Sequence, residues 1–133
     1  MFGFLKKKAG PEKSRALEPE KKDNGSTREP WIGVDLDGTL AVWDSRSSLS
    51  RIGKPVPDML DFVKRMVENE MRVKIFTARA NDPEQLPMIA AWLKENGLPQ
   101  LEVTCIKDYG MQKLYDDRCF QVERNTGRII SGY

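Results

Sequence analysis

The chain has no histidine, and cysteine is scarce, with two among its 133 residues. Without histidine, a Ser-His-Asp triad, a Cys-His dyad and a histidine-ligated zinc site are all excluded. Cys105 and Cys119 stand in apolar surroundings and match neither a zinc spacing nor Cys-x-x-Cys. We therefore expect both to be reduced thiols in the core of a cytoplasmic protein, in preference to a disulfide.

Long apolar runs are missing as well. No stretch approaches the roughly 18 apolar residues of a membrane span. The sequence starts MFGFLKKKAG, whose apolar run is shorter than the roughly 7–15 residues of a signal peptide and precedes its charges. A weak interfacial anchor built from Phe2, Phe4 and Leu5 remains an alternative to a frayed end.

Net charge is also small, at +2, so no overall field points to nucleic acid. Residues 1–29 carry eight Lys and Arg against five Asp and Glu, which leaves 14 against 15 for residues 30–133. The first segment is rich in Lys, Glu, Pro, Gly and Ser, a composition that cannot bury enough surface to fold. We expect a flexible basic tail over residues 1–29 and one folded domain over residues 30–133.

Apolar patterning divides this domain into strands that alternate with helices. Residues 56–70 and 81–97 predict helices, the second with Asp82 as a cap, Gly97 at its end and Pro87 as a misfit. The proline implies an irregular first turn or a later start. Strands are expected at 31–35, within 71–80, at 101–106 and within 113–118, and a hairpin at 119–130 that turns at 125–127. The pattern indicates an α/β fold, a Rossmann-like three-layer sandwich around a mostly parallel sheet, ending in a β-hairpin.

The string WIGVDLDGTL, residues 31–40, places Asp35 and Asp37 at the carboxyl end of the first expected strand. Because strand side chains alternate, both carboxylates are expected to face one way while Leu36 faces the core. Ligands of open α/β sheets gather at the carboxyl ends of the strands. Polar residues that follow the other strands should meet the two aspartates there, namely Thr77, Lys107, Asp116 and Asp117.

This set of carboxylates, one hydroxyl and one ammonium favours phosphoryl chemistry. Carboxylates without histidine or cysteine ligands suit a hard cation, of which Mg²⁺ is the usual one, and a cation would relieve their repulsion. Open positions on such a metal are commonly filled by phosphate oxygens. Lys107 and the hydroxyl of Thr77 would complete a binding site for a phosphoryl group. We prefer this interpretation to the alternative, a simple turn whose acidic side chains are solvated.

Four strings, VDLDGTL, KIFTAR, CIKDYG and YDDR, resemble in order the four motifs of the haloacid dehalogenase (HAD) superfamily of phosphotransferases. The resemblance spans about residues 31–123, and its first motif is the most specific. The longer strings VTCIKDYGMQKLYDDR and NTGR are similar to a group of small HAD-like proteins of phage and prophage genomes. The resemblance implies an HAD-like catalytic domain, a Mg²⁺-dependent phosphatase that hydrolyses phosphate monoesters through an aspartyl-phosphate.

The resemblance also implies a role for each matching residue. Asp35 would be the nucleophile, and Asp37 the general acid and then the general base. Thr77 would bind the phosphoryl oxygens, and Lys107 would steady the transferred charge. Substrate binding would further involve Gly38, Thr39 and Arg79, and Mg²⁺ would be held by Asp35, Asp37 through its backbone carbonyl, Asp116 and Asp117, the last directly or through water.

Three assignments stay open in the sequence. Lys113 is a rival to Lys107, although it falls inside or beside the short fourth strand. Arg79 and Arg118 either touch the substrate or pair with acids. Trp43 either stacks on a ring of the substrate or covers the core, and we expect the second.

No cap domain is expected. Only a short stretch between Leu40 and Lys54, and one helix after Arg79, stand where larger HAD enzymes insert a cap. The open site would admit a small or a macromolecular phosphorylated substrate, including a nucleotide or polynucleotide phosphate end, unless a neighbouring subunit of an oligomer covers it. The alternatives are a non-catalytic HAD-like binding or regulatory module and transfer to an acceptor other than water.

Overall fold

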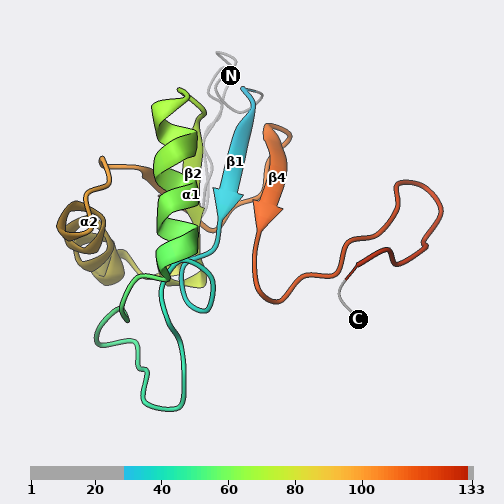
Figure 1. Ribbon diagram of the computed structural model, residues 1–133. Coiled ribbons are helices and arrows are strands. Elements are labelled where there is room, and N and C mark those ends of the chain that lie inside the picture. The colour runs from blue at the N-terminus through green and yellow to red at the C-terminus, as the bar shows by residue number, and fades with distance from the viewer. Residues whose placement is uncertain (1–28, 132–133) are drawn as a thin grey trace, which may run out of the picture.

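The structure, a computed structural model of the chain, describes residues 29–131. The expected basic tail and apolar N-terminal run therefore lie outside the described residues, apart from Glu29. Figure 1 shows a four-stranded sheet with two α-helices. The strands are β1 (Trp31–Val34), β2 (Val73–Phe76), β3 (Glu102–Thr104) and β4 (Met111–Tyr115), and the α-helices are α1 (Pro57–Glu68) and α2 (Leu86–Glu95). Two short 3₁₀ helices, η2 (Ala78–Asn81) and η3 (Pro83–Gln85), lie between β2 and α2.

The sheet has the strand order β3-β2-β1-β4, and every neighbouring pair is parallel. Val34 at the end of β1 lies level with Ile75 of β2 and Tyr115 of β4. This confirms the α/β, Rossmann-like fold. Because all four strands run in the same direction, their carboxyl ends meet at one edge, where the chain turns into the expected site. Within residues 29–131, no helix is long and apolar enough to cross a membrane.

Both α-helices pack on the same face of the sheet. The core is one apolar cluster in which Val34 and Ile75 of the sheet, Val63 of α1 and Leu93 of α2 are all fully buried. The chain moves from β1 to β2 to β3 in one direction, and right-handed crossovers then put both helices on one side. The return from β3 to β4, residues 105–110, carries no helix. Residues 29–131 therefore form two of the three expected layers.

The opposite face of the sheet is organised around Trp31. Its ring lies 6.4 Å from that of Phe76, and the ammonium of Lys74 sits 4.4 Å from its centroid. Its Nε1 donates a 2.8 Å hydrogen bond to Asp108 in the β3–β4 connection. The connection thus closes over the amino end of β1 without a helix.

Pro87 decides where the second helix begins. Asp82 does act as a cap, but for η3, where its side chain accepts a 3.0 Å hydrogen bond from the N–H of Glu84. The α-helix starts only at Leu86, so that Pro87 falls in its first turn, where no backbone donor is lost. Of the two alternatives for the proline, the later start is the one that forms.

The C-terminal segment turns where the sequence predicts but pairs weakly. Asn125 and Gly127 have positive φ angles of 69° and 82°. The two arms are joined by a single bridge, between Val122 and Ile129, instead of a ladder of two strands. This C-terminal arm extends away from the sheet (Figure 1). It carries exposed apolar side chains at Phe120, Val122, Ile129 and Ile130.

Candidate active site

Asp35 is brought to Asp116 and Asp117 by the pairing of β1 with β4. The backbone N–H of Asp35 donates a 2.9 Å hydrogen bond to the carbonyl of Tyr115, the last residue of β4. The next two residues after Tyr115 are the aspartate pair. One carboxylate oxygen from each of Asp35, Asp116 and Asp117 lies within 4.8 Å of the others. We call these three residues the carboxylate cluster.

A tight turn after Asp35 completes the cluster. The carbonyl of Leu36 accepts hydrogen bonds from the N–H groups of Thr39, Leu40 and Ala41, at 2.9–3.1 Å. Gly38 lies in this turn with a φ of +91°, and a Cβ at this position would lie 2.7 Å from Asp117 Oδ2. Gly38 is therefore required both for its backbone angle and for its lack of a side chain.

Thr39 ties the turn to the cluster. Its hydroxyl donates to Asp117 Oδ1 at 2.8 Å, with Asp35 Oδ2 farther away at 3.3 Å, and it accepts from the N–H of Asp117 at 2.9 Å. Because the hydroxyl has one proton, its donor capacity is taken by Asp117. In this structure Thr39 positions a carboxylate, which differs from the substrate contact that the resemblance implies.

Crowding changes the ionisation of the cluster. Partial burial of Asp35, and next the nearby charge of Asp116, raise the pKa of Asp35 to about 7. Burial alone would also raise the pKa of Asp117, but hydrogen bonds involving Thr39 and Asp35 hold it below its usual range. Close to neutral pH, Asp35 therefore binds a proton more readily than Asp117 does. A bound cation would take the place of that proton.

The donor set fits a hard divalent cation. All three groups are carboxylates, they converge within 4.8 Å, and no nitrogen or sulfur ligand accompanies them among residues 29–131. The donor chemistry fits Mg²⁺ without distinguishing it from other hard cations.

Asp37 does not join the cluster. Its two oxygens bind Arg79 in a fork, with Nε to Oδ2 at 2.7 Å and Nη2 to Oδ1 at 3.0 Å. The side chain of Arg79 is only 2% exposed, and that of Asp37 is 21% exposed. Asp35 and Asp37 were expected to face one way because side chains alternate along a strand. The strand ends at Val34, and the turn that follows does not keep that alternation.

Arg79 also holds the flap, which we define as residues 42–54. Its guanidinium donates to the backbone carbonyls of Ser48, Leu49 and Arg51 at 3.0–3.3 Å and to the side chain of Gln85 at 2.8 Å. The flap is also tied to α2, because Trp92 Nε1 donates a 2.8 Å hydrogen bond to the carbonyl of Gly53. Arg79 was expected either to touch the substrate or to pair with an acid. In the structure it pairs with an acid, Asp37, and it also anchors the flap.

Thr77 ends β2 at the same edge. It is 3% exposed, and its hydroxyl oxygen accepts a 3.1 Å hydrogen bond from the N–H of Arg79. Its own proton is donated to no other residue within 29–131. Thr77 therefore keeps a free donor at the edge of the sheet, as a contact to a phosphoryl oxygen requires.

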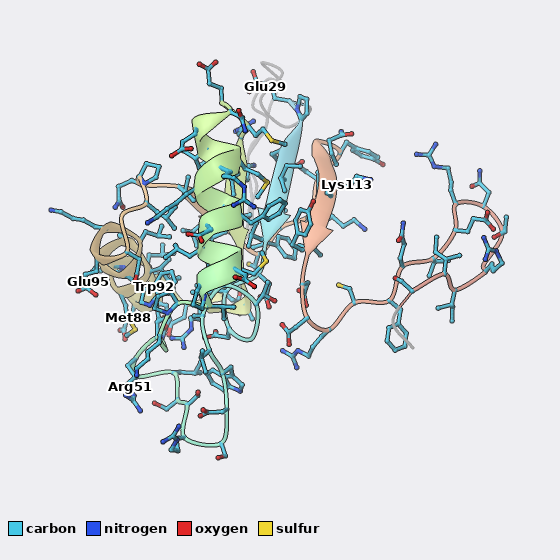
Figure 2. The ribbon with its side chains drawn as sticks, viewed as in Figure 1. Glu29, Arg51, Met88, Trp92, Glu95 and Lys113 are labelled. Atoms are coloured by element: carbon cyan, nitrogen blue, oxygen red, sulfur yellow. The ribbon has the colours of Figure 1, made fainter. Side chains whose placement is uncertain are left out.

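Neither candidate lysine contacts the cluster. Lys107 is exposed in the β3–β4 connection and forms no hydrogen bond or ion pair with the described part of the chain. Lys113 is exposed on β4 level with Ile32, three residues before Asp35 along β1 (Figure 2). The strand register thus argues against Lys113, whereas the role of Lys107 stays a prediction.

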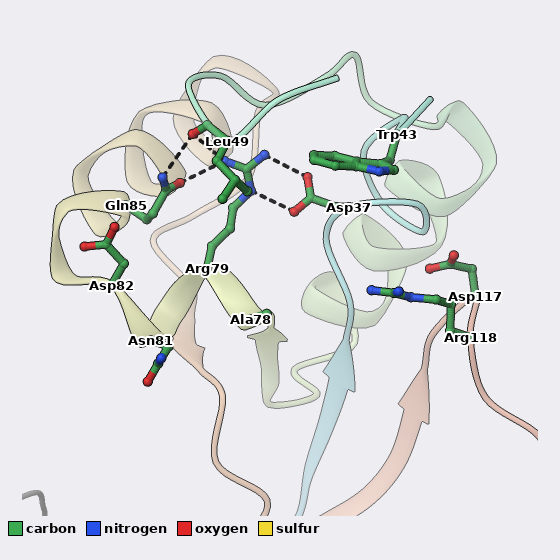
Figure 3. Close-up of a pocket in the computed structure, with 10 residues that line it drawn as sticks. All are labelled: Asp37, Trp43, Leu49, Ala78, Arg79, Asn81, Asp82, Gln85, Asp117 and Arg118. Carbon is green, nitrogen blue, oxygen red and sulfur yellow. Dashed lines mark hydrogen bonds and ion pairs between the residues drawn. The ribbon is translucent and has the colours of Figure 1, made fainter. Parts of the chain in front are cut away.

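A cavity of about 460 Å³ opens beside these residues. Trp43, Arg79 and Arg118 line it together with Asp37 and Asp117 (Figure 3). Trp43 is 45% exposed and does not belong to the apolar core, so the expectation that it covers the core is wrong. The residue type of Arg118 does not decide between a substrate contact and an ion pair. Its position directly after Asp116 and Asp117 does indicate that it lies at the site.

The cysteine expectation also needs correction. Both thiols are free, but they are exposed and not part of the core. Cys105 follows β3, and Cys119 begins the C-terminal arm. Burial, followed by the charges of Asp116 and Asp35, raises the pKa of Cys119, which keeps it a thiol at neutral pH.

Comparison with known proteins supports the fold. No family model matches the chain, and no curated protein matches it. A solved structure described as a conserved protein coded by a locus from Bacteroides thetaiotaomicron is similar, with a TM-score of 0.52 and 20% sequence identity. The match covers 69% of this chain and 78% of that one. At this identity the likeness concerns the fold alone.

Proposed function

We propose that this protein is a Mg²⁺-dependent phosphohydrolase that cleaves phosphate monoesters through an aspartyl-phosphate on Asp35. The observation that supports this most is the carboxylate cluster at the carboxyl edge of the sheet, with oxygens of Asp35, Asp116 and Asp117 within 4.8 Å. The HAD resemblance of the four strings supports the same reaction. Mg²⁺ held by the cluster and by the carbonyl of Asp37 would neutralise the charge of the phosphoryl group.

The protein's own groups then divide the chemistry. A carboxylate oxygen of Asp35 attacks phosphorus, the ester P–O bond breaks, and Asp37 gives a proton to the leaving oxygen. Asp37 next takes a proton from water, which attacks the phosphorus and releases Asp35 and inorganic phosphate. Thr77 donates its free hydroxyl proton to a phosphoryl oxygen, and Lys107 offsets the transferred charge.

Asp37 must change partners to do this. In the structure both of its oxygens are held by Arg79, and a proton donor needs one oxygen released from that fork. Because Asp37 is 21% exposed at the cavity, its side chain has room to turn toward a bound ester. We infer that Arg79 holds the side chain of Asp37 in place between turnovers.

The open site supports a broad choice of phosphate carrier. The described chain has a flap of 13 residues and one α-helix after η3 in place of a cap domain. Such a site admits a small ester or the end of a macromolecule. Free, exposed thiols at Cys105 and Cys119 fit a reducing compartment and support a cytoplasmic location.

A second candidate is a binding module with an HAD-like site that does not turn over. Two observations favour it: no lysine among residues 29–131 contacts the cluster, and both carboxylate oxygens of Asp37 are engaged by Arg79. Such a module would bind Mg²⁺ and a phosphorylated partner without hydrolysis. Turnover separates the two candidates.

The deciding experiment measures phosphate release from aryl and alkyl phosphates with Mg²⁺ and with a chelator. Wild type is compared with Asp35→Asn and with Asp61→Asn, a control that removes an exposed carboxylate from α1. We expect Mg²⁺-dependent release that is lost in Asp35→Asn and kept in the control. If neither wild type nor Asp35→Asn hydrolyses any ester of a broad panel, the binding module is the remaining candidate. Added acceptor alcohols that gain phosphate would identify a phosphotransferase.

A further inference from the structure

Two planar side chains at the cavity form no side-chain hydrogen bond, ion pair or ring contact within residues 29–131, although the charge of Arg118 acts on the neighbouring Asp117. The indole of Trp43 is 45% exposed and forms no hydrogen bond or ring contact with residues 29–131. The guanidinium of Arg118 is also exposed and forms no hydrogen bond or ion pair with them. Only its backbone N–H is engaged, donating to Asp116 Oδ1 at 2.8 Å.

The backbone around these two side chains is fixed. Arg118 follows the carboxylate cluster directly, so its Cα cannot move without moving Asp116 and Asp117. Trp43 stands at the start of the flap, beside the 2.8 Å hydrogen bond from Val42 N–H to Lys54 carbonyl. Figure 3 shows the indole and the guanidinium among the residues that line the cavity, each seen close to edge-on.

We propose that Trp43 and Arg118 bind a nucleobase, so that the substrate is the phosphate ester of a nucleoside. This inference rests on the proposed function, since it names the leaving group of the same reaction. Tryptophan rings and arginine guanidinium planes are the side chains on which bases stack. The contact would remove the exposed indole from water and leave the backbone unchanged.

The cavity has the size and arrangement for such a ligand. Its volume of about 460 Å³ falls within the roughly 300–1,000 Å³ typical of small-molecule sites. Asp37 and Asp117, two residues of the proposed catalytic site, line the same cavity as Trp43 and Arg118, so a base bound there would lie next to that site. In a nucleotide the ribose separates these two ends. A sugar phosphate or phosphoserine has no aromatic ring to stack on Trp43.

The test compares esters that share a phosphate but differ in the base. Hydrolysis of nucleoside 5′- and 3′-monophosphates is measured beside ribose 5-phosphate, a phosphotyrosine peptide and a phosphorylated oligonucleotide, with full-length protein and Mg²⁺. We expect kcat/KM for nucleotides to exceed that for ribose 5-phosphate by about 10- to 100-fold, the usual gain from stacking one base. Mononucleotide and oligonucleotide arms then distinguish a free nucleotide from a nucleic-acid end.

Variants assign the gain to the two side chains. Trp43→Ala should lose the preference for nucleotides while ribose 5-phosphate is hydrolysed as before, and Trp43→Phe should keep most of it. Arg118→Ala should lose part of it. Tyr109→Ala, which removes a 95% exposed aromatic ring from the β3–β4 connection, should leave the preference unchanged. Equal rates for nucleotides and ribose 5-phosphate, a preference for phosphotyrosine, or a Trp43→Ala loss on every ester would overturn the proposal.

Failure of the proposed function gives a different result. If no ester is hydrolysed, calorimetric titration of Asp35→Asn with nucleoside monophosphate and Mg²⁺ still tests the subsite. Binding that is weakened by Trp43→Ala in that background would retain the subsite and reject the phosphatase. Absence of binding there would reject the subsite as well.

Discussion

Arg79 and Asp37 form a two-point ion pair, at 2.7 and 3.0 Å, in which the arginine side chain is almost fully buried. The same guanidinium reaches three carbonyls of the flap and Gln85, so one side chain joins η2, the turn after β1 and the flap. The geometry needs a planar group with donors on both edges, which lysine does not supply.

Removal of this pair should cost stability. Arg79→Ala leaves Asp37 and the carbonyls of Ser48 and Arg51 without the donors of Arg79, while the carbonyl of Leu49 keeps its 3.0 Å hydrogen bond from Gln85 Nε2. We expect a loss of roughly 3 kcal/mol in the free energy of unfolding. Arg79→Lys should lose more than half as much, because an ammonium cannot form the fork. Arg128→Ala, which breaks an exposed pair with Glu123 in the C-terminal arm, serves as control and should cost less than about 1 kcal/mol. Urea denaturation measures all three; an Arg79→Ala value as small as the control's would contradict the role of Arg79 as an anchor.

Gly38→Ala should weaken cation binding through a direct clash. The new Cβ would lie 2.7 Å from Asp117 Oδ2 at a φ of +91°, so the carboxylate must move out of the cluster. We expect Mg²⁺ affinity to fall at least about tenfold, in line with the effect of displacing a group that orients a ligand. Gly127→Ala is a matched control, because Gly127 has a similar φ of +82° and open space around its Cβ position. Calorimetric titration with Mg²⁺ gives both affinities, and equal losses would point to backbone strain instead of the clash.

Stability of the metal-free protein should depend on pH through Asp35. Its pKa is raised to about 7, so the folded state binds a proton more tightly than the unfolded chain does. Its contribution is therefore present at low pH, declines as pH rises from about 4 to about 7, and is constant above that. Asp35→Asn removes this slope and should melt roughly 5 °C above wild type at pH 8 in chelator. Thermal melts from pH 5 to pH 8 test this, and Mg²⁺ should stabilise wild type more at pH 8 than at pH 6.

The two lysines should differ in turnover. Lys113 is level with Ile32 on the sheet and far along β1 from Asp35, so Lys113→Ala should hydrolyse esters at close to the wild-type rate. Lys107→Ala should lose about 100-fold or more in kcat, as removal of a charge-stabilising group does. Retained turnover in Lys107→Ala with loss in Lys113→Ala would reverse the assignment, and Lys107→Arg shows how much charge alone restores.

Much of the fold could be predicted because local patterns agree with it. Apolar periodicity located both α-helices and the first three strands, whereas β4 begins at Met111, two residues before its expected range. Pro87 left open an irregular first turn or a later start of the second helix, and the α-helix starts at Leu86. Local patterns could not predict that the third expected layer is missing from residues 29–131. Alternating strands and helices do not say on which face each helix falls, and residues 105–110 contain too few residues for a helical crossover.

The carboxylate cluster could be predicted because parallel strands bring their ends together, and the structure unites Asp35, Asp116 and Asp117 as expected. The partner of Asp37 could not. Its carboxylate leaves the cluster because the chain turns at Leu36, and the Arg79 donors that capture it come from a 3₁₀ helix 42 residues later. The position of Trp43 could not be predicted for a related reason. A flap has no periodic pattern that distinguishes a residue in the core from one that lines a cavity.

The flap is held by its peptide backbone. Arg79 recognises the carbonyls of Ser48, Leu49 and Arg51, and the side chains of these residues take no part in those bonds. This anchor is consequently independent of those three side chains, whereas Asp44 and Ser47 fix another part of the flap through side-chain hydrogen bonds to backbone N–H groups. Replacement of Leu49, which lines the cavity, would therefore change ligand contacts while Arg79 keeps the loop on its path.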